Sequence, residues 1–161
     1  MKAAILKEIE NLEIEEIKEH EPEENEIVIK VEAWAICGTD IKVYHDGHKH
    51  IVFPRVTGDE VSGIVVKKGK GVKDFKEGDK VAVVPGIPCG KCYYCRKGYQ
   101  TMCDNLKAIG YHYKGGFAEY MLVPKDAVLN GCVNKIPENL LLEYGAIAEP
   151  LACVIIWREI E

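Results

Sequence analysis

No block of Lys and Arg residues stands anywhere in the 161-residue sequence, and the formal net charge is −5. Proteins that bind a phosphate backbone need such positive charge, so the composition argues against nucleic acid as a partner. Long hydrophobic runs are also missing, because the most apolar stretch, residues 144–157, is interrupted by Glu149 and Pro150. That stretch is shorter than the roughly 18 residues that a membrane-spanning helix needs. We therefore expect no membrane partner.

The start of the sequence carries no secretory signal, since its apolar run at residues 3–6 is too short for a signal-peptide core. This predicts a cytoplasmic protein. Proline is scarce, with 7 residues, and the hydrophobic share is 47%, which is typical of a globular chain rather than a disordered one. At about 150 residues per domain, the length predicts one domain over residues 1–161.

Alternating and β-branched segments predict a mainly β fold with short helices. The expected strands cover residues 2–6, 12–17, 26–36, 60–66, 80–84 and 116–123. Helical signals occur only late in the sequence. Pro137 is a suitable first residue for a helix over residues 137–148, and a second helix is expected over residues 151–161.

The seven cysteines need an explanation other than disulfides, because the count is odd and no secretion signal is present. Four of them form the pattern C-x2-C-x2-C-x7-C: Cys89, Cys92, Cys95 and Cys103. Two-residue spacers allow neighbouring thiolates to turn onto one metal ion, and the longer loop supplies the fourth ligand. Four sulfur ligands suit a closed structural Zn²⁺ site. Buried or redox-active thiols and an iron–sulfur cluster are the alternatives.

A second group of residues follows the longest predicted strand. Cys37-Gly-Thr-Asp40 stands at the strand end, and Gly58-Asp-Glu-Val-Ser-Gly63 is followed by Gly69 and Val72. The latter segment resembles the zinc-containing alcohol dehydrogenase signature G-H-E-x2-G-x5-G-x2-V at every fixed position but one. Residues 116–120 and 149–152 are similar to further segments of the zinc-dependent medium-chain dehydrogenases, particularly the polyol and threonine dehydrogenases. The cysteine pattern resembles that family's structural zinc loop, here about residues 86–106.

This resemblance implies a GroES-like domain, a partly open β-barrel that forms the catalytic half of such enzymes. It also implies a catalytic zinc with Cys37 as its thiolate ligand and Asp59 at the position of the family's histidine. Glu60 would be a nearby carboxylate that exchanges with water at the metal. Glu149 would be a late ligand or a carboxylate that holds water. Thr39 would lend its hydroxyl to the path of the alcohol proton.

Two departures from the family pattern affect what we expect. Asp59 adds negative charge where the family has a neutral imidazole, which predicts a weakened or less Lewis-acidic metal site. Lys42 stands where relatives often have a relay histidine. His45, His48 and His50 are interpreted as loop histidines, with compensation for the missing imidazole as the alternative.

A dinucleotide site is not expected, because no G-x-G-x-x-G turn follows a strand in these 161 residues. The family uses NAD(P), so the resemblance implies the zinc-binding catalytic domain of an alcohol or polyol dehydrogenase, truncated or split and inactive alone. The alternative is a non-enzymatic, zinc-stabilised GroES-like module that has lost the catalytic metal. The partner expected is a small alcohol or polyol. Docking to a separate nucleotide-binding chain and self-association are the alternatives for a protein partner.

Overall fold

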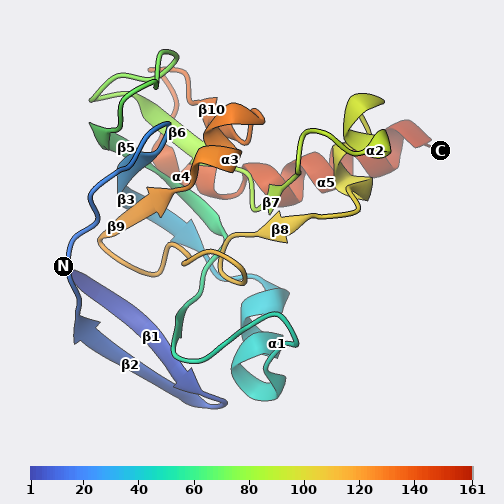
Figure 1. The fold of residues 1–161 in the computed structure, drawn as a ribbon. Coiled ribbons are helices and arrows are strands. Elements are labelled where there is room, and N and C mark those ends of the chain that lie inside the picture. Colours follow the sequence, from blue (N-terminus) through green and yellow to red (C-terminus); the bar gives the residue numbers. More distant parts are fainter. Residues whose placement is uncertain (161) are drawn as a thin grey trace.

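Short strands dominate the chain and pair into three antiparallel sheets in the computed structural model (Figure 1). The structure describes residues 1–160, without the side chains of Trp157, Glu159 and Ile160. The strands are β1 (Lys2–Glu8), β2 (Asn11–Glu16), β3 (Ile27–Ala35), β4 (Arg55–Val56), β5 (Glu60–Lys68), β6 (Lys80–Val83), β7 (Gly86–Ile87), β8 (Lys107–Ala108), β9 (Tyr120–Val123) and β10 (Val133–Lys135). The helices are α1 (Gly38–Asp46), α2 (Tyr93–Arg96), η1 (Gln100–Met102), α3 (Lys125–Leu129), α4 (Leu142–Ala146) and α5 (Ala148–Ile160).

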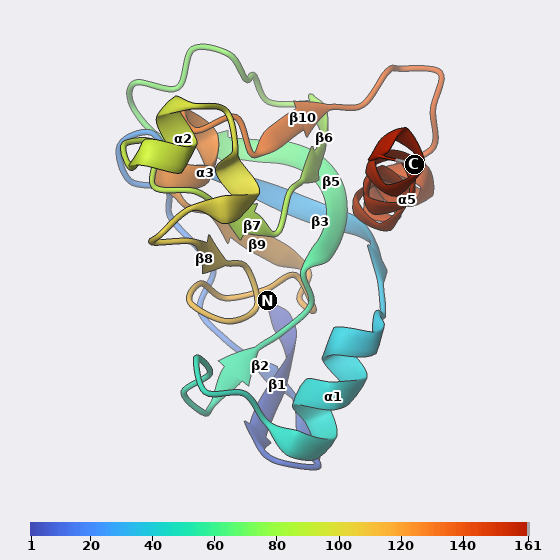
Figure 2. The same cartoon turned by 90° about the vertical axis from the view of Figure 1, so that its right-hand side faces the viewer.

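The five-stranded sheet, in the order β10-β6-β5-β3-β9, carries the main hydrophobic core. Fully buried Ile27, Ile29, Val81 and Val123 from these strands belong to it. A smaller sheet, β2-β1-β4, lies with α1 at the opposite end of the molecule (Figures 1 and 2). No helix within the described residues is both long enough and apolar enough to cross a membrane.

Glycine is required where β5 and β3 lie closest together. A Cβ atom at Gly63 would lie 2.2 Å from the backbone oxygen of Lys30 on β3, so a larger residue would force the strands apart. The family-like motif beginning at Gly58 therefore serves the sheet as well as the segment that carries Asp59.

Helix α1 was not expected from the sequence. Gly38, Thr39 and the β-branched Ile41 and Val43 all have low helix propensity. The helix is stabilised at its start, where the Asp40 carboxylate accepts a 3.0 Å hydrogen bond from the backbone N–H of Cys37. Its end is set by Gly47, whose N–H donates to the Val43 carbonyl.

Two expected elements begin later in the chain than the sequence predicted. The helix expected from Pro137 starts only at Leu142, because residues 137–140 form a turn closed by Leu140 N–H to the Pro137 carbonyl. The strand expected from Gly116 starts at Tyr120. Gly116 and Phe117 instead donate backbone hydrogen bonds to Gly58 and Thr57, which binds this segment to the one preceding Asp59.

Candidate metal centres

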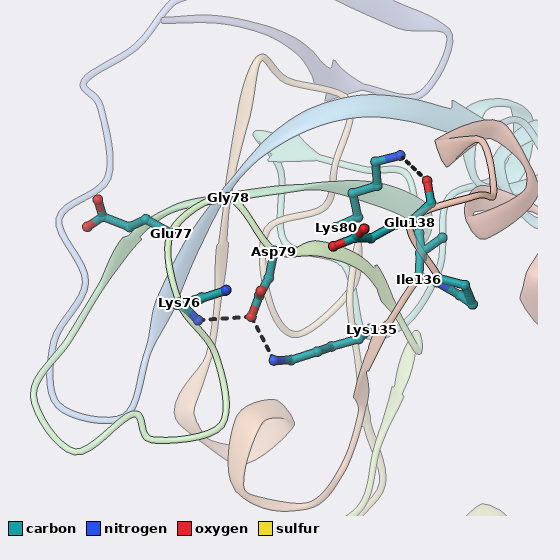
Figure 3. A pocket seen from close by; sticks show the side chains of 9 residues that line it. Lys76, Glu77, Gly78, Asp79, Lys80, Lys135, Ile136 and Glu138 are labelled. Atoms are coloured by element: carbon teal, nitrogen blue, oxygen red, sulfur yellow. Dashed lines mark hydrogen bonds and ion pairs between the residues drawn. The ribbon is translucent and has the colours of Figure 1, made fainter.

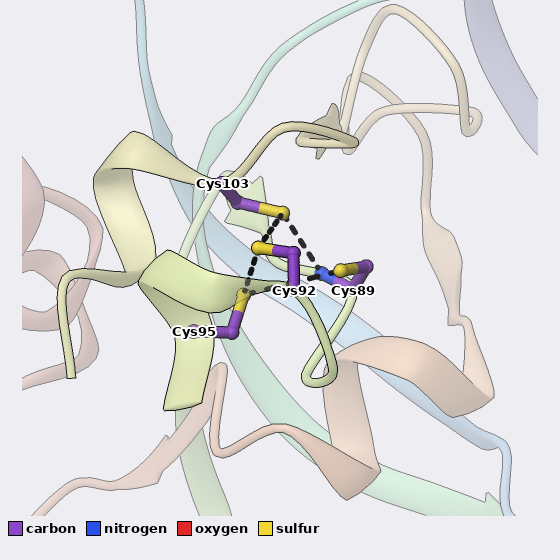
Figure 4. Close-up of side chains that lie close together, drawn as sticks. All are labelled: Cys89, Cys92, Cys95 and Cys103. Atoms are coloured by element: carbon purple, nitrogen blue, oxygen red, sulfur yellow. Dashed lines mark hydrogen bonds between the residues drawn. The ribbon is translucent and has the colours of Figure 1, made fainter. Parts of the chain in front are cut away.

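Four sulfur atoms lie together in the lobe formed by β7, α2, η1 and β8 (Figure 4). The Sγ atom of Cys92 lies 3.4 Å from that of Cys95 and 3.9 Å from that of Cys103. The Sγ atoms of Cys89 and Cys95 are 4.0 Å apart. With Zn–S bonds of about 2.3 Å, a tetrahedral site places its sulfurs about 3.8 Å apart, so this arrangement fits Zn²⁺.

Backbone amides in the lobe favour thiolates over thiols. The N–H groups of Cys89 and Asn105 donate to Cys103 Sγ at 3.2 and 3.4 Å. Backbone N–H groups of Lys91 and Cys92 lower the pKa of Cys89 to about 6. Desolvation and the neighbouring sulfurs raise the pKa of Cys95 to about 12. The four closely packed thiols therefore do not all ionise unless a cation is bound. Zn²⁺ supplies that positive charge when it binds.

A second set of possible ligand atoms lies at the start of α1. One ligand atom each from Cys37, Asp40 and Asp59 lies within 4.8 Å of the other two, and we name this set the Cys37 group. Cys37 precedes the first residue of α1, and its Sγ is 3.8 Å from Asp59 Oδ1. The segment between β3 and α1, the first turn of α1 and the residue before β5 therefore lie together.

Asp59 is held in this position by the backbone around it. Gly58 has a φ of 88°, and a Cβ there would lie 2.5 Å from the Phe117 ring. A side chain other than hydrogen would both strain the backbone and displace Phe117. The Gly116 and Phe117 hydrogen bonds described above then fix the path of the chain into β5.

The Cys37 group is rich in negative charge. Burial, then the charges of Asp40, Glu60 and Glu149, raise the pKa of Asp59 to about 6. Burial also raises the pKa values of Asp40 and of the Cys37 thiol. A thiolate and carboxylates are ligands that Zn²⁺ accepts, so the donor set fits a divalent cation, and protons compete with the metal for it.

The remaining residues of the expected catalytic site lie around this group rather than in it. Glu60 is buried at 7% exposure, and its pKa is raised by desolvation and by the charges of Glu149 and Asp40. Glu149, at the start of α5, accepts a hydrogen bond from Cys153 Sγ at 3.2 Å. Thr39 is exposed in the first turn of α1 and lowers the pKa of Cys37 through its side chain, after larger effects of burial and of Asp40.

Sequence reasoning missed two residues of this site. Asp40 was visible as an acidic residue three positions after Cys37, the spacing of a capping box, but its helix was not expected. Tyr111 left no signal, because it comes from the distant turn after β8. Burial, and then the charges of Asp59, Cys37 and Asp40, raise its pKa, so its hydroxyl lies near enough to the Cys37 group to respond to those charges.

The cavity in Figure 3, of about 800 Å³, lies away from both cysteine sites, between the β5–β6 turn and β10. Asp79 at its centre is already satisfied, since it accepts from Lys76 N–H at 3.0 Å and pairs with Lys135 at 2.9 Å. Lys80 donates to the Glu138 carbonyl at 3.2 Å. Its charged side chains therefore stabilise the fold and do not form a reaction site.

Comparison with known proteins gives a consistent picture. Residues 23–137 match the model of the alcohol dehydrogenase GroES-like domain. A zinc-type alcohol dehydrogenase-like protein of Haemophilus influenzae is 35% identical over 96% of this chain and 44% of its own length. D-altritol 5-dehydrogenase of Agrobacterium fabrum is 41% identical over 80% of this chain and 36% of its own length.

A solved structure agrees with these sequences. The zinc-binding dehydrogenase of Sinorhizobium meliloti, bound to NADP, superposes with a TM-score of 0.88 at 38% identity. That match covers 99% of this chain and 45% of the other. The chain thus spans less than half the length of the relatives it matches.

Proposed function

The chain belongs to the zinc-type medium-chain alcohol and polyol dehydrogenase family, as a GroES-like N-terminal domain, and from this premise we propose that it supplies the zinc-binding catalytic half of an NAD(P)-dependent dehydrogenase. The substrates proposed are small alcohols or polyols, in keeping with the D-altritol 5-dehydrogenase among its relatives. The observation that carries the proposal is the convergence of Cys37, Asp40 and Asp59 within 4.8 Å.

Each side chain has a proposed role. Cys37 and Asp59 would hold the metal, and Asp40 would be available as a further carboxylate. Glu60 and Glu149 would exchange with water beside it, and the Thr39 hydroxyl would relay the alcohol proton, accepting it while passing its own proton on toward solvent. Bound zinc supplies Lewis acidity toward an alcohol oxygen, which favours hydride departure to a nicotinamide.

The four sulfurs of Cys89, Cys92, Cys95 and Cys103 are proposed to hold a separate, structural zinc. Such a site has no open position for water or substrate, so it orders the lobe over residues 86–106 and takes no part in the reaction.

The apolar face of α5 and the segment before it fits the same proposal. Leu141, Tyr144, Leu151 and Val154 each expose more than half of their surface. We propose that the nucleotide-binding half of the enzyme covers this face, since an apolar patch of this kind marks an interaction surface.

One experiment tests the catalytic assignment. Co²⁺ is added to the chain at pH 8, where Asp59 is ionised, after the four-cysteine site has been filled with Zn²⁺. Cobalt bound by a thiolate gives an intense near-ultraviolet charge-transfer band, and we expect Cys37→Ser to abolish it while Cys153→Ser, in an exposed residue, leaves it unchanged. If the unmodified chain gives no such band, the Cys37 group does not hold a metal.

A non-enzymatic, zinc-stabilised module is the second candidate. The observation that favours it is Asp59, whose carboxylate makes the donor set anionic. Burial and the neighbouring carboxylates raise the pKa of Asp59 to about 6. A fusion of this chain to the nucleotide-binding half of the Haemophilus influenzae relative distinguishes the two. If the fusion forms NAD(P)H from polyols and Cys37→Ser abolishes this activity, the chain is the catalytic half of an enzyme. If the fusion folds and binds the dinucleotide but has no activity, the chain is a non-enzymatic module.

A further inference from the structure

Three histidine side chains from two separate loops lie in a row beside the Cys37 group. The ring centroid of His50 is 5.3 Å from that of His48 and 5.0 Å from that of His112. His48 in turn contacts the Tyr111 ring edge-to-face, with centroids 4.7 Å apart. Tyr111 packs against the buried cluster that includes Val43 of α1, the helix whose first turn carries Asp40, so this imidazole row (His48, His50 and His112) begins one side chain away from the element that holds the Cys37 group.

The two loops are held together by the fold. Ile51, between the loop histidines and β4, is buried with Leu6 and Val43, and Tyr111 packs against the same cluster. On the other side of the row, His112 follows fully buried Ile109. The juxtaposition of the rings thus rests on buried neighbours, although all three histidines are themselves exposed.

Hydrogen bonds fix which ring nitrogen carries the proton. The backbone N–H of His50 donates to Nδ1 of His48 at 3.3 Å, and that of Ala108 donates to Nδ1 of His112 at 3.1 Å. Each Nδ1 is therefore an acceptor, and the neutral ring carries its hydrogen on Nε2. A metal ion needs a free lone pair on a ring nitrogen, and in this tautomer Nδ1 already accepts a hydrogen bond while Nε2 carries the hydrogen, so these two rings present N–H donors instead.

Positive charge surrounds the row without being neutralised. Lys49 and Lys42 lie near enough to His48, and Lys107 and Arg55 near enough to His112, to act on the pKa of each ring; Lys107 also lies 5.5 Å from the centroid of the Tyr113 ring. Among the described residues, none of these four basic side chains forms an ion pair, and Arg55 has a buried Nε without a hydrogen-bond partner. Desolvation first, and then the neighbouring positive groups, lower the pKa values of His48 and His112.

We propose that the imidazole row and its flanking basic side chains bind the phosphate group of a phosphorylated polyol, whose free alcohol then reaches the Cys37 group. A phosphate monoester carries close to two negative charges at pH 7 and three acceptor oxygens, which suits several donors from separate loops. A carboxylate has two oxygens and one charge, and would leave most of these donors unused. This inference names a substrate class for the proposed function. It rests on the proposed function in one respect only, namely that the alcohol of the substrate reacts at the Cys37 group.

Phosphate binding is measured from the imidazole resonances of the whole chain by NMR. Adding inorganic phosphate at pH 7 should shift the imidazole resonances of His48, His50 and His112, because its oxygens accept hydrogen bonds from the ring N–H groups. His45, whose Nδ1 lies 2.8 Å from Glu10 on the far side of α1, is the internal control and should not respond. An equal response of His45, or the same shifts from sodium chloride at matched ionic strength, would overturn the proposal.

Variants and competing ligands sharpen the test. The double variant His50→Ala/His112→Ala should weaken phosphate binding about tenfold, whereas His45→Ala should leave it unchanged. Sorbitol 6-phosphate should bind at least tenfold more tightly than sorbitol or gluconate. Preference for gluconate, or Zn²⁺ binding in place of phosphate binding, contradicts it. These readouts need neither zinc at Cys37 nor a dinucleotide, so they succeed or fail independently of the proposed dehydrogenase activity.

Discussion

Asp59 has the largest expected effect on metal binding at the Cys37 group. It lies 3.8 Å from the Cys37 thiol, and its pKa is raised to about 6 by burial and by the carboxylates around it. Where the family resemblance leads us to expect a neutral imidazole, the chain has a carboxyl group that adds a negative charge to the site when it ionises and that titrates near pH 6. The metal affinity of this site therefore depends on pH in the range in which cells operate.

We expect Asp59→His to increase zinc binding at the Cys37 group at pH 7. The imidazole removes one negative charge from the set and leaves Cys37 and Asp40 as anionic ligands. Zinc analysis of the variant should give a second equivalent per chain. Asp74→His, at an exposed acidic position, is the matched control and should not change the zinc content. A variant that folds but gains no zinc would contradict this assignment.

Asp59→Asn should stabilise the chain at pH 7 when only the four-cysteine site holds zinc. A raised pKa means that the folded state binds a proton that the unfolded state has already lost, so ionisation of Asp59 above pH 6 destabilises the fold. The gain should be about 1–2 kcal/mol by thermal unfolding and should shrink as the pH falls from 6 toward 4. Asp74→Asn serves as the control, and a gain that persists at pH 4 would refute the electrostatic cause.

The sequence predicted part of this site and not the rest. Cys37, Asp59, Glu60 and Glu149 lie in segments that resemble the family, and the structure brings Cys37 and Asp59 together. Asp40 and Tyr111 depend on tertiary structure, namely a helix of poor intrinsic propensity and a turn more than 50 residues downstream of Asp59.

At the scale of elements, the strands followed from the sequence better than the helices did. All six expected strands have counterparts, in β1, β2, β3, β5, β6 and the later-starting β9, because alternation and β-branched residues report burial in a sheet directly. Helix α4 begins later than Pro137 suggested, since Ser62 of β5 donates to the Leu142 carbonyl and fixes where the chain meets the sheet. Such contacts between distant residues override local propensity.

The cysteine lobe should lose its order when zinc is removed. Structural zinc sites of this type contribute on the order of 10 kcal/mol of apparent binding energy, whereas α2 and η1 contain no buried residues of their own. Hydrogen exchange over residues 89–105 should accelerate after chelation, while the five-stranded sheet keeps its protection. Cys103→Ser should reproduce this effect and Cys153→Ser should not. Unchanged protection in the metal-free chain would disprove a structural role for zinc.

At the scale of the whole molecule, the chain has a complete core around its five-stranded sheet but leaves an apolar helix exposed. The exposed face over Leu151 and Val154 is the one that the proposed nucleotide-binding half would cover; the side chain of Trp157 lies outside the described residues. Under the proposed function, substrate chemistry and hydride acceptance lie in two bodies, of which this chain would supply the first.

The 161-residue chain alone should neither bind NAD(P) nor oxidise alcohols. Hydride transfer requires cofactor and substrate held in reacting geometry, and no G-x-G-x-x-G turn stands in these residues to bind the dinucleotide. Titration calorimetry with both dinucleotides should give no binding below millimolar concentrations. Low-micromolar binding by this chain would contradict the division of roles.

The most direct test of the account is the zinc content of the purified chain at pH 7, with Cys103→Ser as the comparison. We predict one tightly held equivalent at Cys89, Cys92, Cys95 and Cys103, little zinc at the Cys37 group, and loss of the tight equivalent in the variant. Two full equivalents in the unmodified chain, with Cys37 and Asp59 coordinating one of them, would agree with the proposed catalytic metal but contradict the weakening of this site that we assign to Asp59. A tight equivalent that survives Cys103→Ser would contradict the structural zinc site.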